Sequence, residues 1–181
     1  MHLRLLILLL VAGLASTGAI AVAAGAHAKQ AAAAAPRIPA LPAQNESVVG
    51  RCPIPTRFRP AFERASRDTG FQLSMLVAVA QVESRFKPNA RSKADARGLL
   101  QVLPATAASL KLSADDPASN VLAGARYLRL LLDRYSRTDL ALAAYNAGPT
   151  AVDHAGGAPW RETQTYIANV QQRWASLANC S

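Results

Sequence analysis

Apolar residues recur along most of the chain at the three- and four-residue spacing of an amphipathic α-helix. The pattern predicts a first helix over residues 60–69, with Phe62 and Ala65 on its inner side and Gly70 as its stop. No stretch alternates apolar and polar residues for long enough to predict a strand. The sequence therefore predicts a mainly α protein.

A second helix is predicted to begin within residues 72–74 and to run to about Phe86, where Pro88 ends it. Residues 75–80 of this helix are apolar on every face. A helix that is apolar all round is typically buried, so we expect this one at the centre of the fold.

Glu83 interrupts the apolar pattern of the second helix. Its carboxyl continues the apolar face that Leu76, Val79 and Ala80 form on the preceding two turns. It also lies in the last predicted turn, where the helix dipole disfavours negative charge. Both effects raise the pKa of the carboxyl, and an acid that stays protonated near neutral pH suits general acid catalysis. The alternative is an ion pair with a structural arginine, such as Arg85, Arg91 or Arg97.

The remaining helices are marked by their ends. Asp116 followed by Pro117 has the form of an N-cap and a first helical position. Thr138 or Asp139 is the expected cap of a later helix, which Gly148 and the proline after it end. Helices are predicted over residues 104–110, 116–135, 138–147 and from about 159 onward.

Residues 1–28 are typical of an export signal, because one positive charge precedes a dense apolar run and an A-x-A cleavage pattern. Cleavage is expected after Ala28 or Ala24. No charged residue lies between Arg4 and Lys29, so an uncleaved membrane anchor is the alternative. We expect a periplasmic or secreted protein.

Residues 29–51 are rich in alanine and proline and predict a mobile linker before a folded domain over 52–181. The two cysteines, Cys52 and Cys180, lie at the two edges of that domain. In an exported chain this placement predicts a disulfide between them, and two unrelated thiols are the alternative.

Residues 52–180 hold 16 Lys or Arg against 10 Asp or Glu, which favours an anionic partner such as cell-wall polymer, a membrane surface or nucleic acid. The arginines lack the regular aromatic interleaving of a nucleic-acid surface, so no nucleic acid is expected. The chain has no glycine-rich phosphate loop, and its three histidines are scattered, so neither cofactor nor metal is expected.

Several short segments follow one another in a distinctive order. They are Glu83-Ser84-Arg85-Phe86, the loop residue Ser92, residues 98–106 (GLLQVLPAT), residues 144–149 (AYNAGP), and Glu162-Thr163 with Tyr166. In this order and spacing they resemble the lytic transglycosylases of the soluble (SLT-domain) type, over about residues 60–172. The resemblance implies a lysozyme-like helical domain with a glycan-binding groove.

The resemblance also implies cleavage of the β-1,4 bond between N-acetylmuramic acid and N-acetylglucosamine in peptidoglycan strands. The glutamate that matches Glu83 protonates the glycosidic oxygen and then acts as base toward the muramoyl C6 hydroxyl. That hydroxyl attacks its own anomeric carbon and leaves a 1,6-anhydromuramoyl end. Because this nucleophile is already in place, the second carboxylate of an ordinary glycosidase is not needed.

By the same resemblance Ser92 helps to hold the muramoyl sugar, and Gln101 binds substrate or, alternatively, caps the next helix. Tyr145 supports the catalytic glutamate and Asn146 binds sugar, although both also fit an ordinary helix end. The remaining matches, Glu162 and Tyr166, are expected to form a wall of the groove.

The chain departs from the family pattern at a few positions. Leu100 and Leu103 replace methionines that many relatives have, a change that conserves volume. Asp95 stands where many relatives have glycine and adds a charge near Ser92. Two other functions stay open: a hydrolase of goose-type lysozyme character, and a non-catalytic peptidoglycan-binding component of a secretion or conjugation apparatus. Secretion-system or cell-wall proteins are then further partners, without stable membrane insertion once the signal is cleaved.

Overall fold

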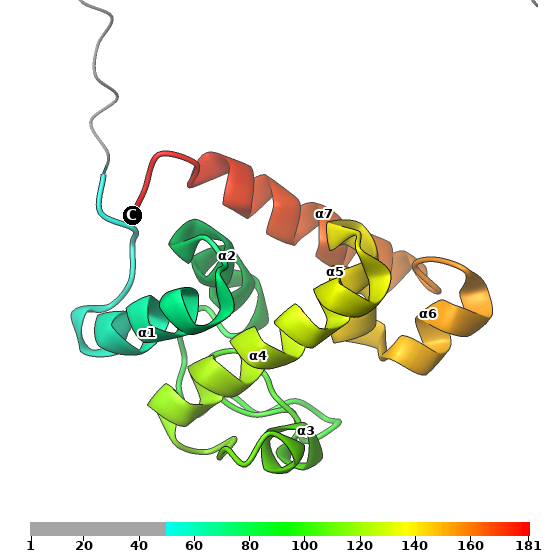
Figure 1. Cartoon of the computed structure of the whole chain (residues 1–181), viewed down its shortest axis with the longest axis horizontal. Helices are drawn as coiled ribbons and strands as arrows, with labels where there is room; N and C mark the ends of the chain where they lie inside the picture. Colours follow the sequence, from blue (N-terminus) through cyan, green and yellow to red (C-terminus); the bar gives the residue numbers. More distant parts are fainter. Residues whose placement is uncertain (1–49) are drawn as a thin grey trace, which may run out of the picture. The chain divides into compact units, whose positions relative to one another are not determined.

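The computed structural model describes residues 50–181, and this part of the chain is helical (Figure 1). The mainly α prediction is confirmed, since extended pairing within the described part is limited to isolated bridges. The predicted export signal and nearly all of the predicted linker lie outside the described residues. The helices are η1 (Thr56–Phe58), α1 (Arg59–Thr69), α2 (Leu73–Glu83), α3 (Pro104–Ser109), α4 (Pro117–Tyr135), α5 (Thr138–Ala147), α6 (Pro149–Ala155) and α7 (Arg161–Ser176).

Helix α2 lies at the centre of the fold, as its apolar sequence predicted. Residues 74–80 are all buried, and Leu76, Val77 and Ala80 have no exposed surface. Helix α7 packs against α2, and α1 packs against both α2 and α4. Helix α5 then contacts α4 and α7 (Figure 1). The buried part of α2 ends at Ala80, and the partly exposed last turn that follows is held in place by it at the surface of the domain.

The ends of several helices follow the local signals. Gly70 ends α1 in the left-handed conformation with φ of 72°. The side chain of Asp116 accepts a 2.7 Å hydrogen bond from the backbone N–H of Ser119, as the predicted N-cap of α4 should. The predicted end of α2 was wrong by three residues. The helix ends at Glu83 because Arg85 and Phe86 turn into the left-handed region, with φ of 52° and 59°.

The segment after α5 also differs from the prediction. Gly148, with φ of 85°, ends α5 as expected, but Pro149 immediately begins α6. Proline serves equally well as a stop and as a first helical residue, so the sequence signal was ambiguous. The expected caps of α5 were wrong: the N-cap is Arg137, and Thr138 and Asp139 are already helical.

A disulfide joins Cys52 to Cys180 across 128 residues, which confirms that pairing. The chain segments beside it also pair through their backbones. The N–H of Gly50 donates to the carbonyl of Asn179 at 2.9 Å, and the N–H of Ser181 donates to the carbonyl of Gly50 at 3.1 Å. Both ends of the predicted domain are therefore tied together.

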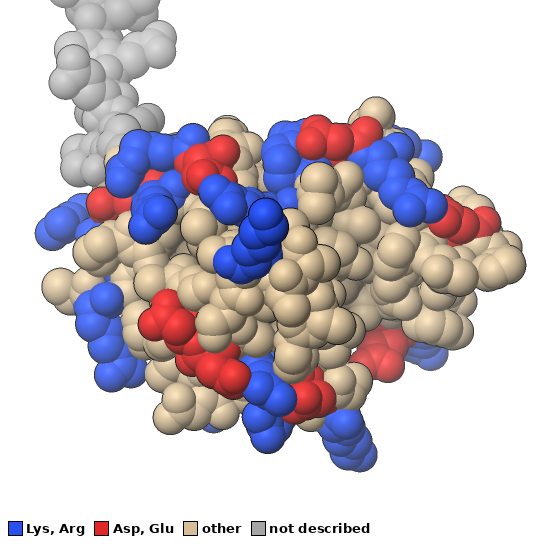
Figure 2. Space-filling view, turned by 60° about the horizontal axis from the view of Figure 1, so that its bottom comes forward, with Lys and Arg blue, Asp and Glu red and all other residues tan. Residues whose placement is uncertain are grey.

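Charge on the described surface is mixed. On the face shown in Figure 2, basic and acidic side chains are interspersed and neither sign forms one continuous patch. Many of these charges are ion-paired, as in Arg126 with Asp68 at 2.7 Å and Arg134 with Asp153 at 2.5 Å. Within residues 50–181 no helix has the length and apolar character needed to cross a membrane.

Candidate active site

Glu83 is the last residue of α2 and its side chain is partly exposed at the surface of the domain. Burial of the carboxyl among the neighbouring helices raises its pKa from 4.5 to about 7, because desolvation penalises the charged form. A hydrogen bond from Tyr166 opposes this shift by stabilising the carboxylate. The carboxyl is thus poised between its two protonation states near neutral pH, as the sequence led us to expect.

Tyr166 of α7 makes the direct contact with Glu83. Its hydroxyl donates a 2.7 Å hydrogen bond to Oε1 of Glu83, and the tyrosine itself is only 7% exposed. Burial, and then the nearby Glu83 charge, raise the pKa of Tyr166 well above its ordinary value, so it stays a donor. Sequence analysis had given Tyr166 only the role of a groove wall, because a contact between α2 and α7 leaves no trace in local sequence.

Tyr145 of α5, the expected partner of Glu83, donates instead to the backbone carbonyl of Leu100 at 2.8 Å. It is nevertheless close to the glutamate: burial raises the pKa of Tyr145 well above its ordinary value, and the Glu83 charge adds to the effect. The structure therefore gives the two tyrosines different tasks. Tyr166 contacts the carboxyl, whereas Tyr145 holds the backbone beside it.

Two hollows meet at Asn146. The first, which we call the α7 hollow, lies between α2, α5 and α7 and is lined by Tyr166, Glu162 and Asn146, among others. The second, the Gln101 hollow, is lined by Gln101, Tyr145 and Asn146 together with exposed Leu103 and other residues. The shared asparagine makes the two hollows neighbours along one surface. Together they bring five of the six predicted substrate residues to one place, and Ser92 lines neither of them.

Asn146 is exposed where the two hollows meet, and a hydrogen bond from a buried residue fixes the orientation of its side-chain amide. The hydroxyl of Thr163, which has no exposed surface, donates a 3.0 Å hydrogen bond to Oδ1 of Asn146. The amide nitrogen has no partner among residues 50–181. Asn146 therefore presents two hydrogen-bond donors to whatever occupies the hollows.

The loop between α2 and α3 carries Gln101 and Ser92. The amide nitrogen of Gln101 donates to the carbonyls of Ala90 at 3.1 Å and Gly98 at 3.0 Å, so the side chain folds back onto its own loop. It does not cap α3, whose N-cap is Leu103. Ser92 is exposed, and its hydroxyl accepts a 3.0 Å hydrogen bond from the N–H of Ala96.

The side chains of Ser84, which directly follows α2, of Asn120 on α4 and of Tyr145 on α5 hold the backbone of this loop beside Glu83. Ser84 donates to the carbonyl of Leu99 at 2.8 Å. Asn120 accepts from the N–H of Leu100 at 2.9 Å, and Tyr145 donates to the carbonyl of the same residue. The loop that forms one wall of the Gln101 hollow is thus fixed to α4, to α5 and to the residue that ends α2.

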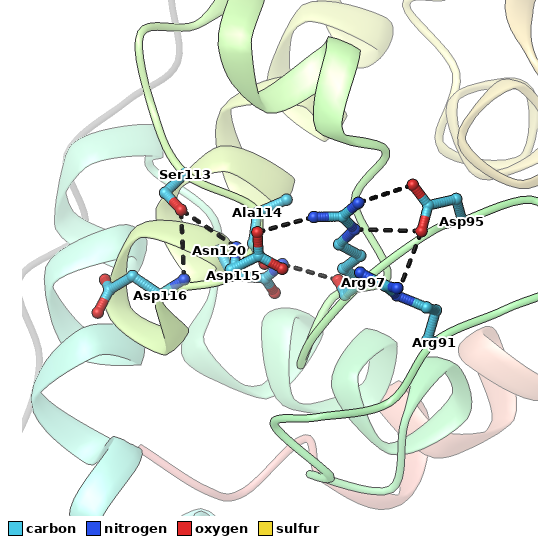
Figure 3. A network of polar contacts seen from close by, with 8 residues as sticks. All are labelled: Arg91, Asp95, Arg97, Ser113, Ala114, Asp115, Asp116 and Asn120. Atoms are coloured by element: carbon cyan, nitrogen blue, oxygen red, sulfur yellow. Dashed lines mark hydrogen bonds and ion pairs between the residues drawn. The ribbon is translucent and has the colours of Figure 1, made fainter.

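Asn120 is a residue that sequence analysis missed. It has no exposed surface, and its amide nitrogen also donates to the carbonyls of Arg97 at 2.7 Å and Ala114 at 2.9 Å (Figure 3). A Cβ on Gly98 would lie 2.6 Å from that nitrogen, so the glycine leaves room for the asparagine. The sequence did offer one signal for it, since Asn120 is a polar residue directly before the buried apolar residues at the start of α4.

Asp95, which the sequence placed as an extra charge near Ser92, is neutralised by ion pairs. Arg97 bonds its carboxylate at 2.8 Å and Arg91 at 3.2 Å (Figure 3). The hydrogen bond from Arg97 lowers the pKa of Asp95. Because Arg97 also bonds Asp115 at 2.7 Å, this network braces the far side of the same loop. Within the described residues, no three His, Cys, Asp or Glu side chains group as metal ligands would.

Comparisons with known proteins identify the family of this domain. The family model of the transglycosylase SLT domain matches residues 60–167, and the chain belongs to this family. The membrane-bound lytic murein transglycosylase F of Desulfosudis oleivorans is 36% identical over 132 residues, which cover 67% of this chain and 27% of that protein. The chain spans a third or less of the length of the curated relatives it matches.

Solved structures share the fold. The 70 kDa soluble lytic transglycosylase of Escherichia coli matches with a TM-score of 0.59 and 27% identity, over 66% of this chain and 24% of that one. Lytic transglycosylase Slt of Pseudomonas aeruginosa, solved as an inactive mutant with glutamine in place of a glutamate, matches with a TM-score of 0.59 and 26% identity. It covers 70% of this chain and 25% of its own. The lysozyme-like helical fold expected from the sequence is confirmed.

Proposed function

We propose that the protein is a peptidoglycan lytic transglycosylase that cleaves the bond between N-acetylmuramic acid and N-acetylglucosamine and leaves 1,6-anhydromuramoyl ends. The observation that carries this proposal is the carboxyl of Glu83, with a pKa of about 7 and a hydrogen bond from Tyr166 beside the two hollows. A group with this pKa can give up a proton and take one back at neutral pH, which a single acid and base must do.

In the proposed reaction, protonated Glu83 donates its proton to the glycosidic oxygen as the bond from that oxygen to the anomeric carbon breaks. The N-acetylglucosamine unit leaves with a free hydroxyl. The glutamate, now ionised, accepts the proton of the muramoyl C6 hydroxyl, whose oxygen bonds to the anomeric carbon. The proton returns to Glu83 and no water is consumed, so one carboxyl completes the cycle.

The residues around the hollows would bind the sugars and position them for this reaction. The free amide N–H groups of Asn146 suit a hydroxyl or acetamido oxygen of a sugar. Exposed Leu103 offers an apolar surface to the face of a sugar ring. The backbone held by Ser84, Asn120 and Tyr145 gives the Gln101 hollow a rigid wall, which keeps the substrate in register with Glu83.

A hydrolase is the second candidate, because Glu162 is another carboxylate that lines the α7 hollow. Hydrolytic glycosidases use two carboxyl groups, one as acid and one as nucleophile or base. Glu162 is exposed, in the first turn of α7. Burial and the bond from Tyr166 account for the pKa of Glu83, and neither involves a second carboxylate.

Digestion of purified cell walls separates these functions. The wild type should release fragments with anhydromuramic ends that contain no oxygen from ¹⁸O-labelled water, detected by mass spectrometry. Glu83→Gln should abolish release while retaining binding to the walls, and Glu162→Gln should keep the anhydro products. Labelled reducing ends from the wild type would establish a hydrolase, and undiminished cleavage by Glu83→Gln would overturn the role of Glu83.

The expected location follows from the substrate. Peptidoglycan lies outside the cytoplasm, which agrees with the predicted export signal over residues 1–28 and with the disulfide between Cys52 and Cys180. Several relatives carry murein in their names. We therefore propose an exported, periplasmic or secreted enzyme whose partner is the glycan strand of the cell wall.

A further inference from the structure

A third hollow adjoins the proposed active site. It lies between the C-terminal end of α2 and the second half of α7, and we call it the arginine hollow. It shares Val82 and Asn169 with the α7 hollow, so the two hollows adjoin along α7. Its polar lining residues are Gln81, Arg85, Asn169, Gln172, Arg173 and Ser176.

The two arginines of this hollow, Arg85 and Arg173, form no ion pair with any residue from 50 to 181. No acidic side chain lines the hollow. Seven other arginines of residues 50–181 are paired with Asp or Glu, namely Arg59, Arg91, Arg97, Arg126, Arg129, Arg134 and Arg137, whereas Arg51, Arg57, Arg64, Arg67 and Arg161 are unpaired as well. The arginine hollow thus gathers two positive charges without a counter-charge.

The amide side chains around the arginines are also without partners. Gln81, Asn169 and Gln172 make no side-chain hydrogen bond within the described part of the chain. Their N–H groups and the two guanidinium groups together form a surface of hydrogen-bond donors. Such a surface suits a ligand that is rich in acceptors and negatively charged, because charge-assisted hydrogen bonds are the stronger ones.

The hollow lies within reach of a substrate bound at Glu83. Arg85 follows that glutamate by two residues, and its φ of 52° carries it out of the helix. On α7, Arg173 lies seven residues beyond Tyr166 on the same face, a rise of about 10 Å. An extended peptide covers about 3.3–3.6 Å per residue, so about three residues span this distance.

We propose that the arginine hollow binds a carboxylate of the peptide stem that the muramoyl sugar carries. This inference rests on the proposed function, since it assumes a peptidoglycan strand at Glu83. The peptide stems carry the free carboxylates of such a strand, whereas its sugars are neutral once the stem is attached. Arginine is the side chain that best matches a carboxylate, through two parallel N–H bonds. The hollow would make the enzyme prefer strands that still carry their peptides.

Binding tests this without any need for cleavage. In a Glu83→Gln background, calorimetry would compare a disaccharide bearing a tripeptide stem with the same compound whose carboxylates are amidated. The background protein should bind the carboxylate form more tightly. Adding Arg85→Gln and Arg173→Gln should weaken that binding by about tenfold or more and leave the amidated form nearly unaffected. Adding Arg67→Gln instead removes an arginine of α1 that is likewise exposed and unpaired, and it should change neither affinity.

Cleavage provides the second measurement. The ratio of kcat/KM on peptide-bearing strands to kcat/KM on strands stripped of peptides should fall by about tenfold in the double arginine variant. An unchanged ratio, or equal affinity for the acid and the amide, would overturn the proposal. Equally strong competition by inorganic phosphate would do the same, because it would indicate a general anion site. If the wild type cleaves neither substrate, the proposed function fails, and the calorimetry still decides the role of the hollow.

Discussion

The hydroxyl of Tyr166 on α7 donates a 2.7 Å hydrogen bond to Oε1 of Glu83 at the end of α2, across 83 positions of sequence. Two opposing effects meet in this contact. Burial of the glutamate favours its protonated form, while the phenol stabilises the carboxylate. Their balance places the pKa of Glu83 at about 7, where one carboxyl can act as acid and then as base.

The pH dependence of cleavage should follow this titration. The first step needs Glu83 protonated, so kcat/KM should be roughly constant below its pKa and fall about tenfold per pH unit well above 7. The measurement is kcat/KM on peptide-free glycan strands between pH 5 and 9. A profile that shows no loss of activity up to pH 9 would contradict the role of Glu83 as acid.

Tyr166→Phe should move that profile. Without the phenol, the carboxylate of Glu83 loses its stabilising hydrogen bond, so its pKa rises and the alkaline fall shifts to higher pH. A matched control is Tyr135→Phe, which removes a hydroxyl bonded to Asp153 at 2.7 Å. The control should keep the wild-type profile. A loss of rate with no shift would mean that Tyr166 only packs against the site.

Glu83→Gln should stabilise the fold at alkaline pH. Because the folded pKa of Glu83 is raised from 4.5 to about 7, the native state holds its proton more tightly than the unfolded chain. Its contribution to stability is therefore complete below pH 4.5 and is lost as the pH rises to about 7. The neutral amide of glutamine does not ionise and so avoids that loss, which amounts to about 3 kcal/mol at most in the free energy of unfolding.

Urea unfolding at pH 5 and pH 8 measures this effect. The difference in the free energy of unfolding between Glu83→Gln and the wild type should be more favourable to the variant at pH 8 than at pH 5. Glu63→Gln is the control, since Glu63 lies on α1 and pairs with Arg59 at 3.5 Å. Equal differences at the two pH values for Glu83→Gln would show that its pKa is not raised.

Asn120→Ala should lower both stability and activity. It leaves the N–H of Leu100 and the carbonyls of Arg97 and Ala114 without their partner, at a cost of about 2–4 kcal/mol in the free energy of unfolding. Because Leu100 precedes Gln101 in the loop, kcat/KM should also fall at temperatures where the variant is fully folded.

Asn89→Ala is the comparison for this change, since Asn89 is exposed and its side chain makes no hydrogen bond within the described part. It should alter the free energy of unfolding by about 0.5 kcal/mol or less. Chemical denaturation and initial rates on the same preparations give both quantities. An Asn120→Ala protein as stable as this control would rule out the asparagine as the support of the loop.

Local patterns in the sequence predicted most of the helices. Gly70 and Asp116 mark helix ends through backbone conformation and a nearby hydrogen bond, which depend on adjacent residues alone. The end of α2 was placed three residues too late, because Arg85 and Phe86 adopt left-handed conformations that their residue types do not favour. Helix α6 was missed because Pro149 can end one helix or begin another.

The sequence by itself determined that a carboxyl stands on an apolar helix face, that the chain is mainly helical, and that its two cysteines flank the folded part. These properties depend on the order of residues along the chain. Only the tertiary structure decided that Tyr166 rather than Tyr145 contacts Glu83, that Asn120 holds the loop, and that Arg85 and Arg173 line one hollow. Such contacts arise where helices distant in sequence pack together, and their geometry depends on the packing of the whole core.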